Sequence, residues 1–209
     1  MQTGKYFLVP CAVNHTAYRQ LAGVTRTKPI IGYVGRIKKY KSVDHLLRAF
    51  AIVLKVLPKA KLVIIGDGDG KPAFERLSYE LQINHAATFT GFLPLEEKVR
   101  LLNQMQIVVN TSAKEGWGLT VTEANACGVP AVASDVPGLR DAVIDGESGI
   151  LYEYGNIEQL AEKILLLLRD ENLHSRLTTG ALEYAQSLTW DTSAKIMLDV
   201  IEKVLQRHL

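Results

Sequence analysis

The sequence has few cysteines, little net charge and no long apolar run, and each of these absences excludes a class of protein. Two cysteines in 209 residues, Cys11 and Cys127, are too few for a disulfide framework. A net charge of +2 argues against a broad nucleic-acid surface, so no nucleic-acid partner is expected. No apolar stretch approaches the ~18 residues that a membrane helix needs, and a signal peptide is not expected. The five histidines show no metal-ligand spacing. What remains is a globular protein of about one domain.

Short apolar runs alternate with segments of helical periodicity along the middle of the chain. The apolar runs are short and bounded by turns, as buried parallel strands are, and cover residues 30–34, 61–65, 87–92, 106–109, 131–133 and 149–152. Helical spacing marks residues 43–57, 71–81 and 95–105. This alternation predicts an α/β fold with a Rossmann-like, doubly wound parallel sheet. Ligands bind such sheets beyond the carboxyl ends of the strands, where Gly35, Gly66, Gly91, Ser112 and Ser134 lie.

The most informative run of the chain contains two glutamates, Glu115 and Glu123. Glu115 precedes a Gly-Trp-Gly turn, and Glu123 lies within the helix that is expected to follow. Two carboxylates can accept hydrogen bonds from sugar hydroxyls, and the free N–H groups and positive dipole end of a helix suit a diphosphate. The alternative, an amphipathic helix with an exposed acid, accounts for Glu123 alone. The run therefore suggests a nucleotide-sugar site.

The same run resembles the Glu-x7-Glu signature of retaining glycosyltransferases of family four, which have the GT-B fold. The resemblance is carried by Ser112, by Glu-Gly-aromatic-Gly from Glu115, and by Glu-Ala-x-Ala-Cys-Gly-x-Pro-Ala-Val-Ala-Ser from Glu123. It implies that Glu115 binds hydroxyls of the donor sugar near the reaction centre and that Glu123 binds the ribose hydroxyls. Donor phosphate contacts would come from Gly116, Trp117, Gly118, Leu119 and Thr120.

A second loop, after the first predicted strand, carries Gly35, Arg36 and Lys41. The family has Gly-Arg, several residues and Lys-Gly here, and in this chain Ser42 replaces the second glycine. The resemblance implies that Arg36 and Lys41 stabilise the departing nucleoside diphosphate, which a guanidinium and an ammonium group suit chemically. The alternative is an ordinary solvated basic loop.

The third predicted strand ends at Gly91, Phe92 and Leu93. In members of the family, backbone groups at this place contact the edge of the nucleobase. We expect these residues to line the base, with a core role as the alternative for Phe92. The Gly-Asp-Gly-Asp-Gly run at 66–70 is interpreted as a tight turn, because glycine supplies positive φ there. No metal and no cofactor is therefore expected, the nucleotide-sugar being the substrate.

The resemblance covers residues 28–209 and implies the second half of a two-domain enzyme. The apolar run at 7–13 resembles the strand that closes the N-terminal Rossmann domain of full-length relatives. The residues around Trp190 resemble the start of the helix that crosses back to that domain. We predict an interdomain linker at 1–28, a nucleotide-sugar-binding domain at 29–189 and a crossing helix at 190–209.

The activity implied by the resemblance is transfer of a sugar from a UDP- or GDP-sugar to an acceptor hydroxyl with retention. No protein nucleophile is needed if the leaving phosphate helps to deprotonate the acceptor. An acceptor glycan or lipid-linked sugar would bind through the N-terminal domain, so the chain alone is expected to be inactive. A GT-B nucleotide-sugar epimerase, a phosphorylase-type enzyme with pyridoxal phosphate and a non-catalytic binding module are the alternatives. The expected location is cytoplasmic, with peripheral membrane contact of the full-length enzyme as the alternative.

Overall fold

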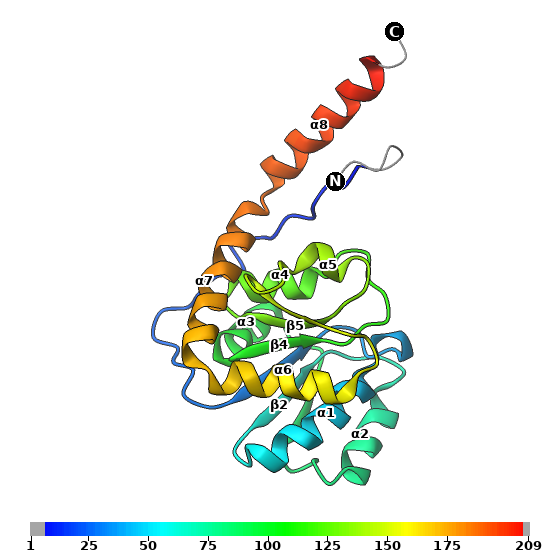
Figure 1. The fold of residues 1–209 in the computed structure, drawn as a ribbon, viewed down its shortest axis with the longest axis vertical. Helices are drawn as coiled ribbons and strands as arrows, with labels where there is room; N and C mark the ends of the chain where they lie inside the picture. The colour runs from blue at the N-terminus through cyan, green and yellow to red at the C-terminus, as the bar shows by residue number, and fades with distance from the viewer. Residues whose placement is uncertain (1–6, 207–209) are drawn as a thin grey trace.

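The protein is described by a computed structural model over residues 7–206, and its centre is a six-stranded parallel sheet covered by helices (Figure 1). The strands are β1 (Ile30–Val34), β2 (Lys61–Ile65), β3 (Ala87–Gly91), β4 (Ile107–Asn110), β5 (Ala131–Ser134) and β6 (Gly149–Tyr152). Their order is β3-β2-β1-β4-β5-β6, and each neighbouring pair is parallel. The predicted Rossmann-like α/β fold is confirmed. Its switch point lies between β1 and β4, where open α/β sheets bind ligands.

The helices follow the strands in the predicted alternation. They are η1 (Lys39–Lys41), α1 (Val43–Val56), α2 (Lys71–Glu80), α3 (Leu95–Gln104), α4 (Leu119–Ala126), α5 (Leu139–Ala142), α6 (Ile157–Arg169), α7 (Glu171–Ser187) and α8 (Trp190–Gln206). The three helices predicted from periodicity end one residue earlier than expected. The bounds of β1, β2 and β6 are as predicted, and those of β3, β4 and β5 differ by one residue at one or both ends, which is the usual precision of element ends.

The two larger of three apolar clusters fill the two sides of the sheet. One joins α1 and α6 to the strands through side chains such as Phe50, Leu46 and Ile164. The other joins α3, α4 and α7 through side chains that include Leu102 and Cys127. Burial on both sides explains why the strands read as continuous apolar runs rather than as alternating ones.

The N-terminal segment departs from the sequence-based expectation, because the run at 7–13 forms no strand in the part of it that the structure describes. Val13 N–H donates instead to the carbonyl of Leu188, at 2.9 Å. The side chain of Asn103 donates to the carbonyl of Arg19 at 3.0 Å and accepts from the N–H of Leu21 at 2.8 Å. The segment thus pairs its backbone with helical elements, since the open edges of the sheet belong to β3 and β6.

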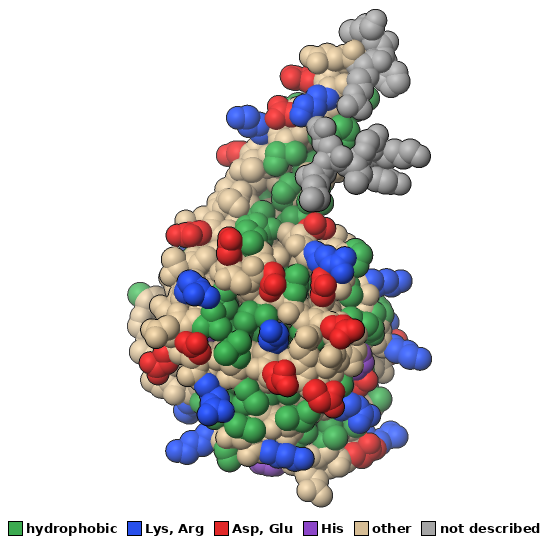
Figure 2. Space-filling model, in the orientation of Figure 1, with side chains coloured by type: hydrophobic (Ala, Val, Ile, Leu, Met, Phe, Trp, Pro, Cys, Tyr) green, Lys and Arg blue, Asp and Glu red, His purple; other side chains and the backbone are tan. Residues whose placement is uncertain are grey.

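The last helix, α8, projects from the body of the domain and runs beside the N-terminal segment (Figure 1). None of its described residues is buried, and Ser193 Oγ donates to the carbonyl of Pro10 at 2.7 Å. Figure 2 shows hydrophobic side chains exposed along it. The exposed hydrophobic residues of α8 include Trp190, Leu198 and Ile201. Its role as a crossing helix and the predicted domain boundaries stay predictions. Within residues 7–206, the helices lack the combination of length and apolar character that crossing a membrane requires.

Candidate functional site

The loops that follow β1 and β4 are joined to each other at the switch point of the sheet. Thr111 Oγ1 donates to the carbonyl of Lys41 at 2.9 Å, and the Ala113 N–H donates to the carbonyl of Tyr40 at 2.8 Å. These two bonds hold the end of η1 against the start of the β4–α4 loop. The loop contact brings Lys41 next to Glu115, although 74 positions separate them in the chain.

The carboxylate of Glu115 is held by three side chains, all through the same oxygen. Lys41 Nζ lies 2.5 Å from Oε1, Ser112 Oγ donates to it at 2.7 Å, and Asn110 Nδ2 donates at 3.4 Å. The Lys41 and Glu115 side chains are each only 14% exposed, so salt screens their ion pair weakly. Glu115 Oε2 has no hydrogen-bond partner among residues 7–206. The arrangement fixes the carboxylate and leaves one oxygen able to accept from a ligand hydroxyl.

Glycines set the path of the chain around this carboxylate. Gly138 has φ +83°, and a Cβ there would lie 2.3 Å from the carbonyl oxygen of Glu115. Gly118 has φ +101°, and a Cβ there would lie 2.8 Å from Leu139 Cδ2. Both positions therefore require glycine, for conformation and for space. The loop before α5 packs directly on the backbone that carries Glu115.

Helix α4 begins beside Glu115 with Gly118 as its N-cap and no side-chain cap. Within the described chain, the backbone N–H groups of residues 116–120 donate no hydrogen bond. Gly116 and Leu119 are exposed, so an anion can reach this end of the helix. The Trp117 side chain points elsewhere: it is buried in the apolar cluster, and its Nε1 has no partner among the described residues. The Trp117 side chain is therefore engaged in packing rather than available to a ligand.

The second predicted acid, Glu123, has its own lysine. Lys98 Nζ of α3 lies 3.4 Å from Glu123 Oε2, and both side chains are 21% exposed. The same ammonium group lies 4.8 Å from the centre of the Tyr18 ring, which is cation–π distance. Burial, the neighbouring Glu123 carboxylate and a hydrogen bond to that carboxylate raise the pKa of Tyr18 well above its ordinary value.

Sequence reasoning missed Lys98, Tyr18 and Asn110, because no motif marks them. The one available signal is that Lys98 is the fourth residue of α3, where the helix dipole disfavours a cation. An unfavourable charge at a helix start calls for a partner elsewhere in the fold.

The remaining predicted residues lie at the same edge of the sheet. Arg36 is exposed, and its guanidinium makes no hydrogen bond or ion pair with any described residue, while its carbonyl accepts from Tyr33 Oη at 3.0 Å. Gly35 N–H donates to the carbonyl of residue 65 at 3.0 Å. Phe92 is 83% exposed, which excludes the core role considered for it.

Two more predicted residues, Gly91 and Leu93, are less accessible than Phe92. Gly91 is buried with φ +74°, and Leu93 is half-buried against the apolar cluster. The side chains of Arg36 and Phe92 are thus open to a ligand at the carboxyl edge, whereas Leu93 is partly engaged in packing.

Ser42, the residue that departs from the family pattern, preserves the backbone shape that glycine would give. It lies in the left-handed region at φ 48° and ψ 45°, and it is buried at the start of α1. Its Oγ is 3.0 Å from the Oη of Tyr154, which lies in the loop between β6 and α6. The substitution leaves the loop that carries Lys41 in its place.

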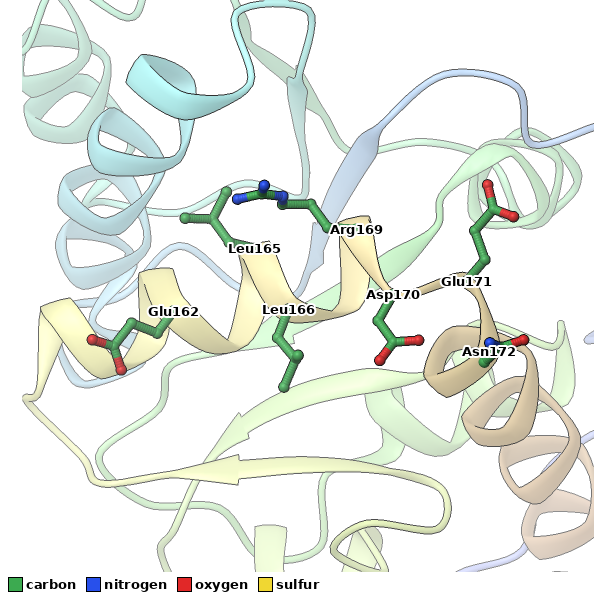
Figure 3. Close-up of a pocket in the computed structure, with 7 residues that line it drawn as sticks. All are labelled: Glu162, Leu165, Leu166, Arg169, Asp170, Glu171 and Asn172. Atoms are coloured by element: carbon green, nitrogen blue, oxygen red, sulfur yellow. The ribbon is translucent and has the colours of Figure 1, made fainter.

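A large surface hollow lies away from this edge. It has a volume of about 760 Å³ and is lined by the last turns of α6 and the first of α7: Glu162, Leu165, Leu166, Arg169, Asp170, Glu171 and Asn172 (Figure 3). The labelled side chains diverge rather than converge on a common point. Because α6 leads away from the carboxyl end of β6, this hollow lies toward the opposite edge of the sheet. It carries none of the predicted residues.

Metal ligation has no geometric support in the region that the structure covers. Its His, Cys, Asp and Glu side chains form no group of three or more that could hold an ion. In the Asp-x-Asp run, Asp69 pairs with Lys38 at 3.0 Å, and Asp67 Oδ1 accepts from the Gly68 N–H at 2.7 Å. The run has the contacts of a turn.

One family model and several curated proteins match the sequence of this chain. The model of the family described as "Glycosyl transferases group 1" matches residues 15–184. The D-inositol 3-phosphate glycosyltransferase of Stackebrandtia nassauensis is 32% identical over 201 residues, which are 92% of this chain and 45% of the relative. That of Thermomonospora curvata is 34% identical over 192 residues, 87% of this chain and 44% of the relative. The chain spans less than half the length of these curated relatives.

Solved structures agree with the sequence comparison. Sucrose-phosphate synthase from Thermosynechococcus elongatus superposes with a TM-score of 0.83 at 27% identity, over 96% of this chain and 53% of that one. A mutant of S. aureus TarM in complex with UDP superposes with a TM-score of 0.83 at 25% identity, over 92% of this chain and 38% of TarM. The C-terminal domain of a group 1 glycosyl transferase, LpcC from Francisella tularensis, superposes with a TM-score of 0.76 at 25% identity. The match covers 84% of this chain and 97% of that domain. The chain therefore belongs to the glycosyl transferases group 1 family, and its fold is that of a GT-B C-terminal domain.

Proposed function

We propose that the chain is the donor-binding domain of a retaining glycosyltransferase of family four, which transfers a sugar from a nucleotide-sugar to an acceptor hydroxyl. The observation that carries this proposal is the pair of anchored glutamates. Glu115 and Glu123 are each held by a lysine through one oxygen, on either side of an uncapped helix N-terminus. Two fixed acceptors flanking free backbone N–H groups match the hydroxyl–diphosphate–hydroxyl sequence of a nucleotide-sugar.

Different residues bind the diphosphate, the sugar, the ribose and the base of the donor. The N–H groups of residues 116–120 and the exposed Arg36 bind the diphosphate, Glu115 accepts from sugar hydroxyls, and Glu123 accepts from ribose hydroxyls. Phe92, exposed beyond the end of β3, packs against the base. Lys41 reaches the phosphate from its place beside Glu115, where it also fixes the position of that carboxylate. The bond from the anomeric carbon to the phosphate breaks as the acceptor oxygen attacks, and the leaving phosphate accepts the acceptor's proton.

Support for a nucleoside diphosphate ligand comes from relatives. TarM was crystallised with UDP, and it resembles this chain at 25% identity. The curated relatives are named for D-inositol 3-phosphate, a phosphorylated cyclic polyol, which makes a hydroxylated acceptor the natural class to test. No metal or cofactor is needed in this scheme, because Arg36, Lys41 and the helix N-terminus supply the positive charge that the phosphates require.

Calorimetry against UDP-, GDP- and ADP-sugars and their free diphosphates tests donor binding. One of these should bind with an affinity that falls as salt rises, since charge-assisted contacts hold the diphosphate. Arg36→Ala and Lys41→Ala should each weaken binding by about 1.5–3 kcal/mol, the value of one hydrogen bond to a charged group. EDTA should change nothing. If both variants bind as the wild type does, the phosphate site is elsewhere.

The roles of the two acids can be separated with free diphosphate and with the whole donor. Glu123→Ala should weaken both ligands, whereas Glu115→Ala should weaken the nucleotide-sugar and leave the free diphosphate nearly unchanged. Lys38→Ala, in an exposed ion pair of the same edge, is the matched control and should alter neither. Equal losses of diphosphate affinity in both glutamate variants would contradict the assignment.

The 209-residue chain should bind the donor and transfer nothing, because it spans less than half of the relatives that it matches. Aligning acceptor with donor can lower a barrier by ~7–11 kcal/mol, and an acceptor-side domain would supply that alignment. Robust transfer by the chain alone, abolished by Glu115→Ala, would refute this part. A sugar product formed without any acceptor would favour the epimerase alternative.

A further inference from the structure

Lys98 lies in the first turn of α3, where the helix dipole disfavours a positive charge. It is the fourth residue of α3, close to the positive end of the helix dipole, and Glu96 and Glu97 beside it are the residues that suit this end. Its side chain is mostly buried, although lysine ordinarily keeps its charge in water. The stabilising contacts of its ammonium group come from outside α3.

Those contacts are Glu123 and Tyr18. Lys98 Nζ lies 3.4 Å from Glu123 Oε2 and 4.8 Å from the centre of the Tyr18 ring. Tyr18 belongs to the segment before β1 and is buried against α4 and α7 in the apolar cluster. The three side chains therefore come from three distant parts of the chain and meet at the side of α4, beside the end at which the diphosphate is proposed to bind.

The ion pair with Lys98 restrains the Glu123 side chain and leaves its carboxylate able to accept another hydrogen bond. Lys98 engages Oε2, while the Glu123 side chain stays 21% exposed and so within reach of a ligand. A carboxylate held at one oxygen loses little further side-chain freedom when its other oxygen accepts from a ligand, so binding costs less entropy. A free glutamate on a helix would have to be ordered at that moment.

We propose that Lys98, supported by the ring of Tyr18, is a positioning residue that fixes Glu123 toward the ribose and sets the preference of the site for ribose over deoxyribose. This inference rests on the proposed function, and it assigns to α3 and to the segment before β1 a part in recognising the nucleoside. Lys98 acts through Glu123 and does not itself touch the ribose.

The test is the ratio of two dissociation constants measured on the same protein. UDP, GDP and ADP are each titrated against their 2′-deoxy counterparts, and the pair that binds most tightly is used. The wild-type chain should prefer the ribose form by roughly tenfold or more, the effect of one hydrogen bond to a charged group. In Lys98→Met the two forms should bind almost equally. A general loss of phosphate attraction or of folded protein affects both ligands alike, so it cancels in the ratio.

Two variants serve as controls. Lys98→Arg keeps a cation beside Glu123 and should keep most of the preference. Arg100→Met removes an exposed cation from the same helix, without a contact to Glu123, and should leave the ratio at its wild-type value. Together they separate a specific ion pair from the net charge of α3.

Three results would overturn the inference while leaving nucleotide binding intact. A wild-type chain that binds both forms equally would mean that the ribose 2′-hydroxyl is not recognised. An unchanged ratio in Lys98→Met would mean that Lys98 only attracts phosphate or only stabilises the fold. A larger ratio would mean that Lys98 competes with the ribose for Glu123. If no diphosphate binds the wild-type chain, the proposed function itself fails, and this inference with it.

Discussion

Removing the ammonium group of Lys41 should destabilise the protein far more than removing any exposed lysine. The pair that Lys41 forms with Glu115 is short, at 2.5 Å, and both side chains are only 14% exposed. In Lys41→Met the carboxylate would keep Ser112 and Asn110 as partners but would lose its counter-charge. Methionine fills a similar volume, so the change tests charge rather than packing.

The expected loss follows from these contacts. Removing one partner of a fully buried pair costs about 3–5 kcal/mol, and one hydrogen bond to a charged group contributes about 1.5–3 kcal/mol. Because two neutral donors remain on Glu115 and some solvent reaches it, we expect about 2 kcal/mol. For a domain of this size that corresponds to a fall in Tm of about 4–8 °C. Adding Glu115→Gln to Lys41→Met should restore part of the loss, since no uncompensated charge is then left.

Urea denaturation and thermal unfolding of the two variants measure this directly. Lys38→Met is the matched control, because its ion pair with Asp69 has side chains that are 42% and 71% exposed. Such a surface pair contributes less than about 1 kcal/mol. The reasoning is refuted if Lys41→Met and Lys38→Met lose the same free energy of unfolding. It is also refuted if adding Glu115→Gln to Lys41→Met lowers the free energy of unfolding further instead of restoring part of it.

Three other predictions follow from the packing. Gly138→Ala should lower stability by about 1–3 kcal/mol and weaken nucleotide-sugar binding, because its Cβ would strike the carbonyl of Glu115 at a positive φ; wild-type values in both assays would contradict this. Arg26→Met should lower stability in urea by about 2–4 kcal/mol, since its guanidinium donates to three backbone carbonyls at the ends of α3 and α4; a loss below about 1 kcal/mol would count against these bonds. Iodoacetamide at pH 8 should modify Cys11 but not Cys127 in mass spectra of the folded chain, because burial raises the pKa of the Cys127 thiol to about 11. Equal labelling of both cysteines at pH 8 would contradict the burial of Cys127. The stability that the neutral Cys127 thiol contributes is complete below the ordinary thiol pKa of about 9 and is lost as the pH rises toward 11.

The positions of the elements could be predicted from the sequence because they depend on local pattern. Runs such as 30–34 and 61–65 are apolar throughout, and strands covered on both sides bury every side chain. Helix α1 repeats its apolar residues every three to four positions, which places them on one face. Glycines and serines after the strands marked the edge at which the predicted site residues gather. The Glu-x7-Glu run was informative for the same reason, since its spacing is local.

The side-chain partners were decided by the tertiary structure. Lys41 and Glu115 are 74 positions apart, and Lys98 and Glu123 are 25 apart, so only the parallel packing of the strands and helices brings them into contact. The same packing buried the Trp117 side chain, which the local motif does not specify.

Both ends of the chain show the same limit of local pattern. An apolar run such as 7–13 has the composition of a strand, but a strand also needs a neighbouring edge, and in the described residues its backbone bonds to the end of α7. The periodicity of 190–206 determined a helix, and nothing in that periodicity specified which surface the helix would meet. The sequence by itself determined which segments are strands, helices and turns, since those follow from neighbours along the chain. Which charges pair and which aromatic rings are buried followed from contacts between distant residues, and only the folded chain creates those contacts.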